Sequence, residues 1–270
     1  MIVCITGASS GIGEAAALRF AREPDTTLVL VARRDDRLRA LAERLGGGAT
    51  HVAVDLTDAD APARVRAHLE AEHGGRLDVL VNNAGAAWRA RFGDSEKGGW
   101  ENIRRTMELN FDAQVRLTEA LLPLLRASQP SSIVNVASTA GRVARAGTGA
   151  YSASKFALIG WSDALHFEER EHGVHVGVVL PGFISTEGFP QEELTTSAAT
   201  RWTVSTPEVG AEAIVDCALN GKAERYVPRP YGLAAVLRVV APGLVRRVLS
   251  GKQAARMTTS TGADAADAQR

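Results

Sequence analysis

The stretch that decides the fold lies at the beginning of the chain, where Met1-Ile2-Val3-Cys4-Ile5 is followed by Thr6-Gly7-Ala8-Ser9-Ser10-Gly11-Ile12-Gly13. The apolar run predicts a buried strand, and the sequence after it predicts a helix that begins near residue 12. Gly7 suits a tight turn, Gly11 lets a ligand approach the backbone, and Gly13 lets the helix pack closely on the strand. Because a helix N-terminus carries free N–H groups and the positive end of the helix dipole, this turn predicts an anion site, with Ser9 and Ser10 as further donors.

The same alternation of strand and helix continues along the chain. Apolar runs indicate strands buried on both faces, and segments of helical period lie between them. We expect strands near 1–5, 27–32, 50–54, 77–81, 132–137, 174–180 and 224–228, and helices near 12–22, 35–45, 60–73, 97–126, 150–172 and 207–220. This order predicts a doubly wound α/β fold with a mainly parallel sheet of about seven strands. In such a fold the glycine turn is either a binding site or a connection that uses glycine for geometry alone.

Composition and charge narrow the classes of protein to which the chain can belong. Its 270 residues carry 31 Lys and Arg against 31 Asp and Glu, which lacks the net positive charge typical of nucleic-acid binding. Cys4 and Cys217 give neither a disulfide framework nor a metal-ligand cluster, so we expect a cytoplasmic protein without a metal. No apolar run of about 18 residues is free of charged side chains, which argues against a membrane span.

We expect a single domain over residues 1–250, because no internal repeat or linker divides the chain. Residues 251–270 contain little that could be buried, which predicts a disordered tail. Before this tail, residues 229–250 predict two short amphipathic helices broken at Pro242-Gly243. Their apolar faces could close over a pocket, form a subunit contact or lie on a membrane surface, and we rank these alternatives in that order.

Two arginines follow the second predicted strand. NAD-binding folds place an acidic residue there for the ribose 2′-hydroxyl, whereas this chain has Arg33 and Arg34, and Asp35 and Asp36 come slightly later. Guanidinium groups form forked, charge-assisted bonds to a 2′-phosphate, so the pair favours NADP(H) over NAD(H). Two solvated arginines at a helix start are the structural alternative, although positive charge there opposes the helix dipole.

Tyr151 and Lys155 lie four residues apart at the start of a predicted helix, so their side chains share one face. An ordinary phenol has a pKa near 10, and a nearby ammonium lowers that pKa, which would make Tyr151 a proton exchanger at neutral pH. The chain has only three tyrosines and four lysines, so this spacing is rarely met by chance. An exposed pair on a helix surface is the structural alternative.

Further motifs follow in order: Asn82-Asn83-Ala84-Gly85, Ser138, Tyr151-Ser152-Ala153-Ser154-Lys155 and Pro181-Gly182. With the glycine turn, they resemble the short-chain dehydrogenase/reductase family in its classical branch, which has a single Rossmann-type domain. The resemblance implies that Tyr151 is the general acid/base and that Ser138 hydrogen-bonds the same substrate oxygen. It also implies that Lys155 binds the nicotinamide ribose and tunes Tyr151, and that Asn110 holds a water that relays protons to Lys155.

The resemblance further implies a cofactor-binding set at the ends of the strands. Asp55 would accept the adenine amino group, although an acid in this position often only orders a loop. The Asn83-Ala84-Gly85 segment would lie along the cofactor, Asn82 would stabilise the sheet, and Pro181 to Thr186 would hold the nicotinamide carboxamide. The full set comprises Gly7, Ser9, Ser10, Gly11, Ile12, Gly13, Arg33, Arg34, Asp55, Leu56, Asn83, Ala84, Gly85, Tyr151, Lys155, Pro181, Gly182, Ile184 and Thr186.

The substrate is less well defined by the sequence. Residues 187–205 would form a lid that closes with an apolar face. Arg142 and Arg145 could steer an anionic substrate, although solvated arginines are the more common case.

We therefore expect an oxidoreductase that transfers hydride between NADP(H) and a carbonyl or secondary alcohol. Two alternatives stay open: an NAD-dependent alcohol dehydrogenase of the same family, and a non-catalytic NADP-sensing protein, which would need no proton relay. The resemblance implies a homodimer or homotetramer. Surface attachment to a membrane stays open.

Overall fold

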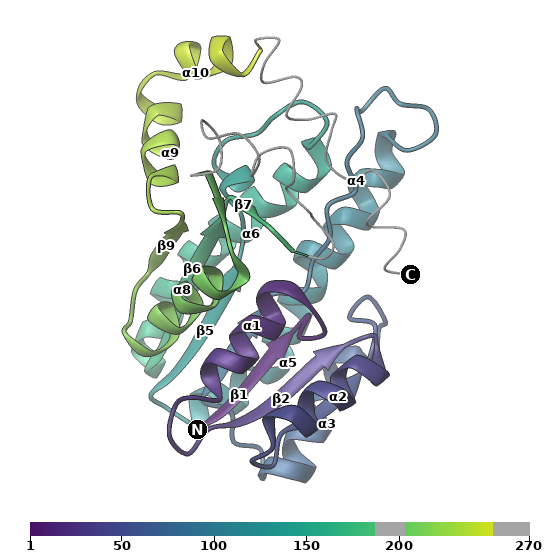
Figure 1. The fold of residues 1–270 in the computed structure, drawn as a ribbon, viewed down its shortest axis with the longest axis vertical. Helices are drawn as coiled ribbons and strands as arrows, with labels where there is room; N and C mark the ends of the chain where they lie inside the picture. Colours follow the sequence, from purple (N-terminus) through teal and green to yellow (C-terminus); the bar gives the residue numbers. More distant parts are fainter. Residues whose placement is uncertain (187–202, 251–270) are drawn as a thin grey trace.

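The computed structural model describes residues 1–186 and 203–250 and contains one parallel sheet of seven strands (Figure 1). These strands are β1 (Ile2–Thr6), β2 (Thr27–Ala32), β3 (Thr50–Ala53), β4 (Val79–Asn82), β5 (Ser131–Val136), β6 (Val174–Pro181) and β9 (Glu224–Val227). Their order is β3-β2-β1-β4-β5-β6-β9, and every neighbouring pair runs parallel. The predicted Rossmann-type α/β fold is confirmed.

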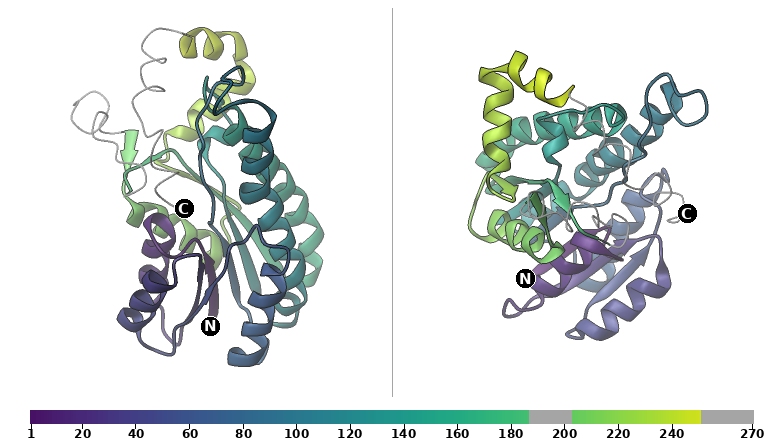
Figure 2. Two further views of the ribbon diagram at one scale, coloured as in Figure 1. Left: turned by 90° about the vertical axis from the view of Figure 1, so that its right-hand side faces the viewer. Right: turned by 45° about the horizontal axis from the view of Figure 1, so that its top comes forward.

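Helices cover both faces of the sheet, which is seen between two helical layers in the left view of Figure 2. One layer contains α1 (Gly11–Phe20), α2 (Asp35–Leu45) and α8 (Pro207–Leu219), which contribute to one hydrophobic core. The opposite layer contains α3 (Ala61–His73), α5 (Ala113–Ala127) and α6 (Gly149–Glu169). The chain therefore winds to both sides of the sheet.

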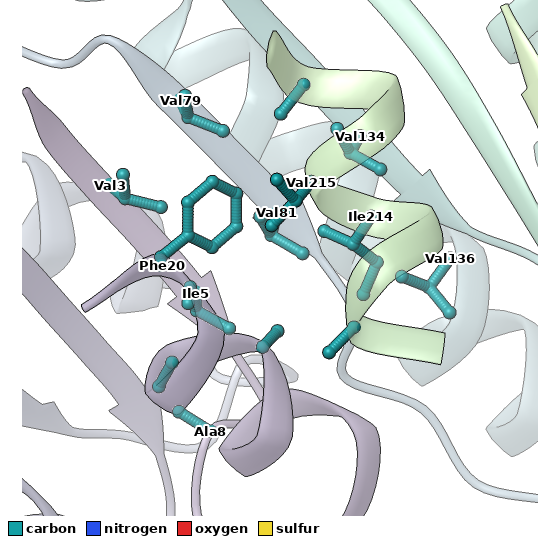
Figure 3. Close-up of a cluster of buried hydrophobic side chains, with 14 of the residues drawn as sticks. Val3, Ile5, Ala8, Phe20, Val79, Val81, Val134, Val136, Ile214 and Val215 are labelled. Atoms are coloured by element: carbon teal, nitrogen blue, oxygen red, sulfur yellow. The ribbon is translucent and has the colours of Figure 1, made fainter. Parts of the chain in front are cut away.

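Alternate residues of the central strands enter different cores. Val3 and Ile5 of β1 pack with Phe20 of α1 and Ile214 of α8, as Figure 3 shows, whereas Cys4 between them belongs to the core on the other face. All five side chains are fully buried. Because both faces of each strand are covered, the strands have continuous apolar sequences rather than an alternating pattern.

The helix predicted over residues 97–126 consists of three segments. These are α4 (Gly99–Met107), a π-helical turn (Glu108–Asp112) and α5, which follows without a break. The periodicity did not indicate the π-turn, because apolar positions on either side keep a helical spacing. Turns of this kind are frequent at functional sites, and Asn110 lies in this one, fully buried.

The direction of strand order reverses between β1 and β4, which is where open α/β sheets bind their ligands, beyond the carboxyl ends of the strands. After β6, a short sheet of β7 (Phe183–Ile184) and β8 (Val204–Ser205) forms beside this end. Of the expected lid, 187–205, only the last residues are described. Residues 187–202 and the expected tail, 251–270, lie outside the described part of the chain.

Two helices, α9 (Tyr231–Val240) and α10 (Pro242–Leu249), follow β9, with the break at the predicted proline. They stand at the upper end of the molecule in Figure 1, away from the helical layers. Neither has a fully buried residue, and several of their aliphatic side chains are exposed. Within residues 1–186 and 203–250, no helix has the length and apolar character needed to cross a bilayer.

Candidate active site

A cleft of about 550 Å³ opens at the carboxyl ends of the strands. It is lined by nearly all of the residues that the sequence nominated, although they come from seven separate segments of the chain. These are Gly7, Ser9, Ser10, Gly11, Ile12, Arg33, Arg34, Asp55, Leu56, Asn83, Ala84, Gly85, Ser138, Tyr151, Lys155, Pro181, Gly182, Ile184 and Thr186. The two nominated residues outside this lining, Gly13 and Asn110, are both buried behind it.

The glycine loop forms one end of the cleft. Gly7 and Gly11 have φ of +66° and +60°, a left-handed conformation that favours glycine. A Cβ on Gly13 would lie 2.3 Å from the Gly7 carbonyl oxygen, so only glycine lets α1 pack this closely on the loop. Since α1 begins at Gly11, the positive end of its dipole lies at the loop, as an anion site requires.

Both predicted arginines lie beside this loop. The Arg34 guanidinium donates hydrogen bonds to the Ser9 hydroxyl at 3.0 Å and to the Ser10 hydroxyl at 2.8 Å. Arg33 Nη1 lies 3.7 Å from Asp55 Oδ2, while Asp55 Oδ1 accepts hydrogen bonds from the Thr57 backbone and side chain. The loop end of the cleft therefore combines a helix N-terminus, two hydroxyls and two guanidinium groups, which fit the phosphates of a dinucleotide.

The Asn82-Asn83-Ala84 segment fixes β4 to its neighbours. Asn82 Nδ2 donates to Asn135 Oδ1 and to Thr118 Oγ1, both at 2.9 Å, and so joins β4 to β5 and α5. The Asn83 amide donates to the backbone oxygen of Thr6 at 2.9 Å, which ties the segment to the end of β1. These bonds hold the floor of the cleft between its two ends.

Tyr151 lies at the opposite end, in the first turn of α6, with Ser138 from the loop after β5. Burial raises the pKa of Tyr151, while the Ser138 hydroxyl and the charges of Arg89 and Arg145 act to lower that pKa. Ser138 itself donates a hydrogen bond to the Pro181 carbonyl at 3.2 Å and accepts one from the Ala140 N–H at 3.1 Å. The raised pKa keeps the phenol protonated at neutral pH, as a proton donor must be.

Lys155 differs from what its spacing predicted. Its Nζ donates a hydrogen bond to the Val136 carbonyl at 2.9 Å and lies 5.8 Å from the centroid of the Tyr151 ring. Burial lowers the pKa of Lys155 to about 7, and Lys155 is not among the groups that lower the pKa of Tyr151. In this structure the cations that favour phenolate are Arg89 and Arg145 instead.

Asn110 has its side-chain amide fully engaged within the protein. Its Oδ1 accepts a hydrogen bond from the Ala86 N–H at 2.9 Å, and its Nδ2 donates to the Ala86 carbonyl at 2.9 Å and to Ser154 Oγ at 3.1 Å. A Cβ on Gly85 would lie 2.9 Å from this Oδ1 and 3.5 Å from Lys155 Nζ, which places Asn110 close to the lysine. The amide thus positions the segment after Gly85.

Sequence reasoning missed Arg89 and underestimated Arg145. Both line the cleft beside Tyr151, and Arg145 stacks on the Phe183 ring with its Cζ 4.8 Å from the centroid. Arg142, the other arginine considered, forms an ion pair with Glu224 at 2.6 Å. No sequence signal marked Arg89, because it stands in an irregular loop. Tyr231 and Ala234 of α9 also line the cleft, so this helix contacts the site.

Fold and site together define a Rossmann-type oxidoreductase: a dinucleotide loop faces a tyrosine, a serine and a lysine across one cleft. Comparison with known proteins gives the family. A family model for short chain dehydrogenases matches residues 1–196. The chain belongs to the short-chain dehydrogenase/reductase family, whose members act on C=O and CH–OH groups with NAD(P).

Similar proteins extend beyond the matched segment. Dehydrogenase/reductase SDR family member 7B of Bos taurus is 31% identical, over 93% of this chain and 81% of its own length. An uncharacterized oxidoreductase of Mycobacterium bovis is 35% identical, over 92% of this chain and 72% of its own length. A fatty acyl-CoA reductase of Mycobacterium tuberculosis is 35% identical, over 75% of this chain and 72% of its own length.

Proposed function

We propose that the protein is an NADP(H)-dependent reductase that converts an apolar ketone or aldehyde to the alcohol. The observation that carries the cofactor preference is the pair Arg33 and Arg34 beside the glycine loop, where NAD-specific folds have a carboxylate. Arg34 already bridges Ser9 and Ser10, so a 2′-phosphate would meet two guanidinium groups at the rim of the loop.

The residues of the cleft fit NADP(H) along its length. The loop Gly7 to Gly13 would hold the pyrophosphate, Asp55 and Leu56 the adenine, and Asn83 to Gly85 the central part. Pro181, Gly182, Ile184 and Thr186 would hold the nicotinamide end, and Thr186 already lies against the loop, 3.3 Å from a Cβ built on Gly11. When bound, the cofactor supplies or accepts the hydride.

The chain's own residues would manage the proton. Tyr151 would donate its phenolic proton to the carbonyl oxygen, which its raised pKa suits. Ser138 would stabilise the charge developing on that oxygen, and the positive field of Arg89 and Arg145 would stabilise the phenolate left behind. Lys155 would bind ribose hydroxyls. Because the Asn110 amide is engaged with Ala86, a water relay would use the main-chain carbonyl of its π-turn.

Apolar residues at the tyrosine end of the cleft support a largely hydrocarbon substrate. Val143, Phe183 and Leu249 line this end, together with Trp88. The mycobacterial relative named a fatty acyl-CoA reductase fits the same substrate class. The direction is proposed as reduction, because a protonated phenol is an acid rather than a base.

The test is a comparison of rates with NADPH and NADH on ketones, aldehydes, 3-oxoacyl thioesters and sterols, following nicotinamide absorbance. We expect NADPH to be preferred about tenfold or more. Tyr151→Phe should lower kcat by about 10² to 10⁴ while leaving the Kd for NADPH within about twofold. Tyr226→Phe, which removes a phenol that interacts with Arg142 and Glu224, is the matched control.

The alternatives make different predictions. An NAD-dependent alcohol dehydrogenase would favour NADH and the oxidative direction. A non-catalytic NADP sensor would bind NADPH but turn over no substrate, and Tyr151→Phe would then change nothing. The intact set of Ser138, Tyr151 and Lys155 around one cleft supports an enzyme.

Assembly and location form part of the proposal. We expect a homodimer or homotetramer in the cytoplasm, where the buried thiols Cys4 and Cys217 stay reduced. The role of α9 in closing the pocket is supported by Tyr231, Ala234 and Ala235 in the cleft lining. Leu233, Val236 and Val239 of the same helix are exposed, as a subunit contact or attachment to a membrane surface would require. Deletion of residues 231–250, followed by measurement of oligomer size and vesicle binding, distinguishes these roles.

A further inference from the structure

The helices α9 and α10 expose a continuous set of aliphatic side chains. Among residues 1–186 and 203–250, more than half of the large apolar side chains that are exposed lie on these two helices. We call them the α9–α10 aliphatic face: Leu233, Val236, Leu237, Val239, Val240, Leu244 and Val248, which are 38–79% exposed. Exposed apolar residues are ordinarily scattered singly over a protein surface, so their grouping here indicates a contact surface.

The arrangement of side chains around α9 shows which way this face points. Ala234 and Ala235 line the cleft. Positions 233, 236, 237 and 240 follow the i, i+3, i+4, i+7 spacing of one helical stripe, and all four are exposed. In a helix that only covers its own protein, the large aliphatic residues would face inward and the small or polar ones outward. The reversed pattern indicates that the outer stripe of α9 meets another apolar surface.

The segment that carries this face is basic. Residues 229–250 contain four arginines, at positions 229, 238, 246 and 247, and no aspartate or glutamate. The two nearest acidic residues before the segment, Asp216 and Glu224, already pair with Arg225 and Arg142. Aliphatic side chains enter the headgroup region of a bilayer, and guanidinium groups bind the phosphates of anionic lipids. An apolar face on a basic segment therefore matches the surface of an anionic bilayer.

A second copy of the chain fits the same face less well. In a two-fold symmetric contact the patch would meet itself. The arginines of both copies would then be brought together, and the segment supplies no carboxylate to neutralise them. Charge complementarity thus favours anionic lipid over a subunit contact.

We propose that the α9–α10 aliphatic face docks the protein on a bilayer surface that contains anionic lipids, and that the cleft takes its carbonyl substrate from that surface. The second part rests on the reductase function proposed above. Ala234 and Ala235 of α9 and Leu249 of α10 line the cleft, so the helices that meet the bilayer also form a wall of the site. Figure 1 shows both helices projecting from the upper end of the molecule, away from the helical layers.

The first experiment measures binding to lipid without turnover. Full-length protein is sedimented with sucrose-loaded vesicles of phosphatidylcholine alone or of equimolar phosphatidylcholine and phosphatidylglycerol. We expect a partition coefficient about tenfold or more higher on the anionic vesicles, and a decrease between about 0.1 M and about 0.5 M salt, which screens the arginines. Absence of binding to the anionic vesicles overturns the proposal. Equal binding to both vesicle types at both salt concentrations also overturns it, because the arginines would then take no part.

Substitutions in the apolar stripe assign the binding to this face. Replacing two exposed valines together, by Val236→Ser and Val240→Ser, should lower the partition coefficient on anionic vesicles about 10- to 100-fold. The matched control, Val209→Ser with Leu219→Ser, removes two exposed aliphatic side chains of α8 and should leave the partition coefficient within about twofold. Thermal unfolding verifies that both variants are folded. Unchanged binding of the α9 variant overturns the proposal.

Substitutions of arginine test the charge complementarity. Arg246→Gln with Arg247→Gln should lower the partition coefficient on anionic vesicles about 10- to 30-fold and leave that on phosphatidylcholine nearly unchanged. Arg22→Gln with Arg170→Gln removes two exposed arginines elsewhere and is the control for the same loss of charge. An equal decrease in both variants would mean that net charge alone attracts the protein to lipid, and would overturn docking by α9 and α10.

Sedimentation velocity tests the competing occupant, a second copy of the chain. We expect the variant with Val236→Ser and Val240→Ser to have the oligomeric state of the wild type. Loss of an oligomer in this variant would assign the face to a subunit contact and overturn the proposal.

The kinetic experiment separates delivery of substrate from the general function. With NADPH, hexadecanal is offered in the anionic vesicles and cyclohexanone in solution. We expect the variant with Val236→Ser and Val240→Ser to reduce hexadecanal about tenfold or more slowly, while kcat/KM for cyclohexanone stays within about twofold. An equal change for both substrates overturns delivery from the bilayer. A wild type that reduces neither substrate overturns the reductase function and delivery with it, whereas docking is decided by the vesicle binding alone.

Discussion

At the loop end of the cleft Arg34 is fixed by hydrogen bonds to Ser9 and Ser10, whereas at the tyrosine end Arg145 rests on the ring of Phe183. Ser9 and Ser10 follow β1, and Arg34 follows β2, which pairs with β1 in the sheet. Arg145 lies in an irregular loop, rests on Phe183 of β7 and interacts electrostatically with Tyr231 of α9. The comparison indicates that the cofactor end is set by the fold itself, while the substrate end is set by loops that can vary independently of it.

The largest effect is expected from Gly13→Ala at the loop end. The added Cβ would lie 2.3 Å from the Gly7 carbonyl oxygen and 2.6 Å from Asn83 Nδ2, so α1 and the loop must separate. We expect kcat/KM with NADPH to fall about 100-fold or more and stability to fall by about 1–3 kcal/mol. Thermal unfolding and steady-state kinetics measure these changes. Gly160→Ala in α6, where a Cβ meets nothing within 4 Å, should leave kcat/KM unchanged and raise stability by about 0.5–1 kcal/mol, as alanine does in place of glycine inside a helix.

The second prediction tests how much of the cofactor preference lies in Arg34. Removing its guanidinium in Arg34→Ala should weaken NADPH binding by about 10- to 100-fold, while NADH binding changes little. Fluorescence titration with both cofactors provides the measurement. Arg39→Ala serves as the control, because it removes an exposed arginine that pairs with Asp35 in α2, the helix that follows Arg34. Equal weakening of both cofactors would mean that Arg34 supports the loop rather than the 2′-phosphate.

The third prediction concerns the buried lysine between the two ends. The pKa of Lys155 is about 7 in the folded protein, against an ordinary value of 10.5, so unfolding takes up a proton between these pH values. Stability of the cofactor-free protein should therefore rise from pH 7 to 9, by up to about 1.4 kcal/mol per pH unit, relative to Lys155→Met. Urea unfolding at several pH values measures this difference.

The control for this experiment is Lys222→Met, which removes an exposed lysine. The stability of Lys222→Met should change with pH in the same way as that of the wild type. A wild-type protein whose pH dependence matches that of Lys155→Met would show that the amine is not desolvated as the structure places it.

The smallest effect is expected from Gly182→Ala at the tyrosine end. The added Cβ would lie 2.5 Å from the Tyr231 ring, whose hydroxyl donates a hydrogen bond to the Thr203 carbonyl at 3.1 Å. Because Tyr231 begins α9, the helix can shift with it, and we expect KM for the carbonyl substrate to rise only about two- to tenfold. Because Gly182 also belongs to the proposed nicotinamide segment, the Kd for NADPH is measured beside KM. Gly243→Ala, in open space on α10, is the control.

The difference between the loop end and the tyrosine end of the cleft also explains which features could be predicted from the sequence. The strands and the glycine loop were correctly predicted because each is specified by adjacent residues, and a buried parallel strand has a recognisable apolar run. The parallel arrangement follows from the alternation of strands and helices, and right-handed crossovers determine on which side of the sheet each connection lies. Tyr151 and Lys155 were recognised because their spacing lies within one helix.

The features that the sequence did not indicate depend on tertiary contacts. The π-turn at Glu108–Asp112 disturbs the helical period too little to be seen. Arg89 and Arg145 act together only because the loop after β4 meets the loop after β5, and the orientation of Lys155 toward Val136 depends on the end of β5. The grouping of charged side chains from separate loops inside one cleft is therefore the property that the sequence did not reveal.

The two cysteines have a practical consequence. Cys4 and Cys217 are the only cysteines of the chain, both are fully buried, and burial raises the pKa of each thiol to about 12. Thiolate, the form that alkylating reagents attack, is thus nearly absent from the native state at neutral pH. A single cysteine introduced at Val239, which is 79% exposed on α9, would accept a maleimide dye selectively. Its emission would report movement of that helix as ligands enter the enzyme.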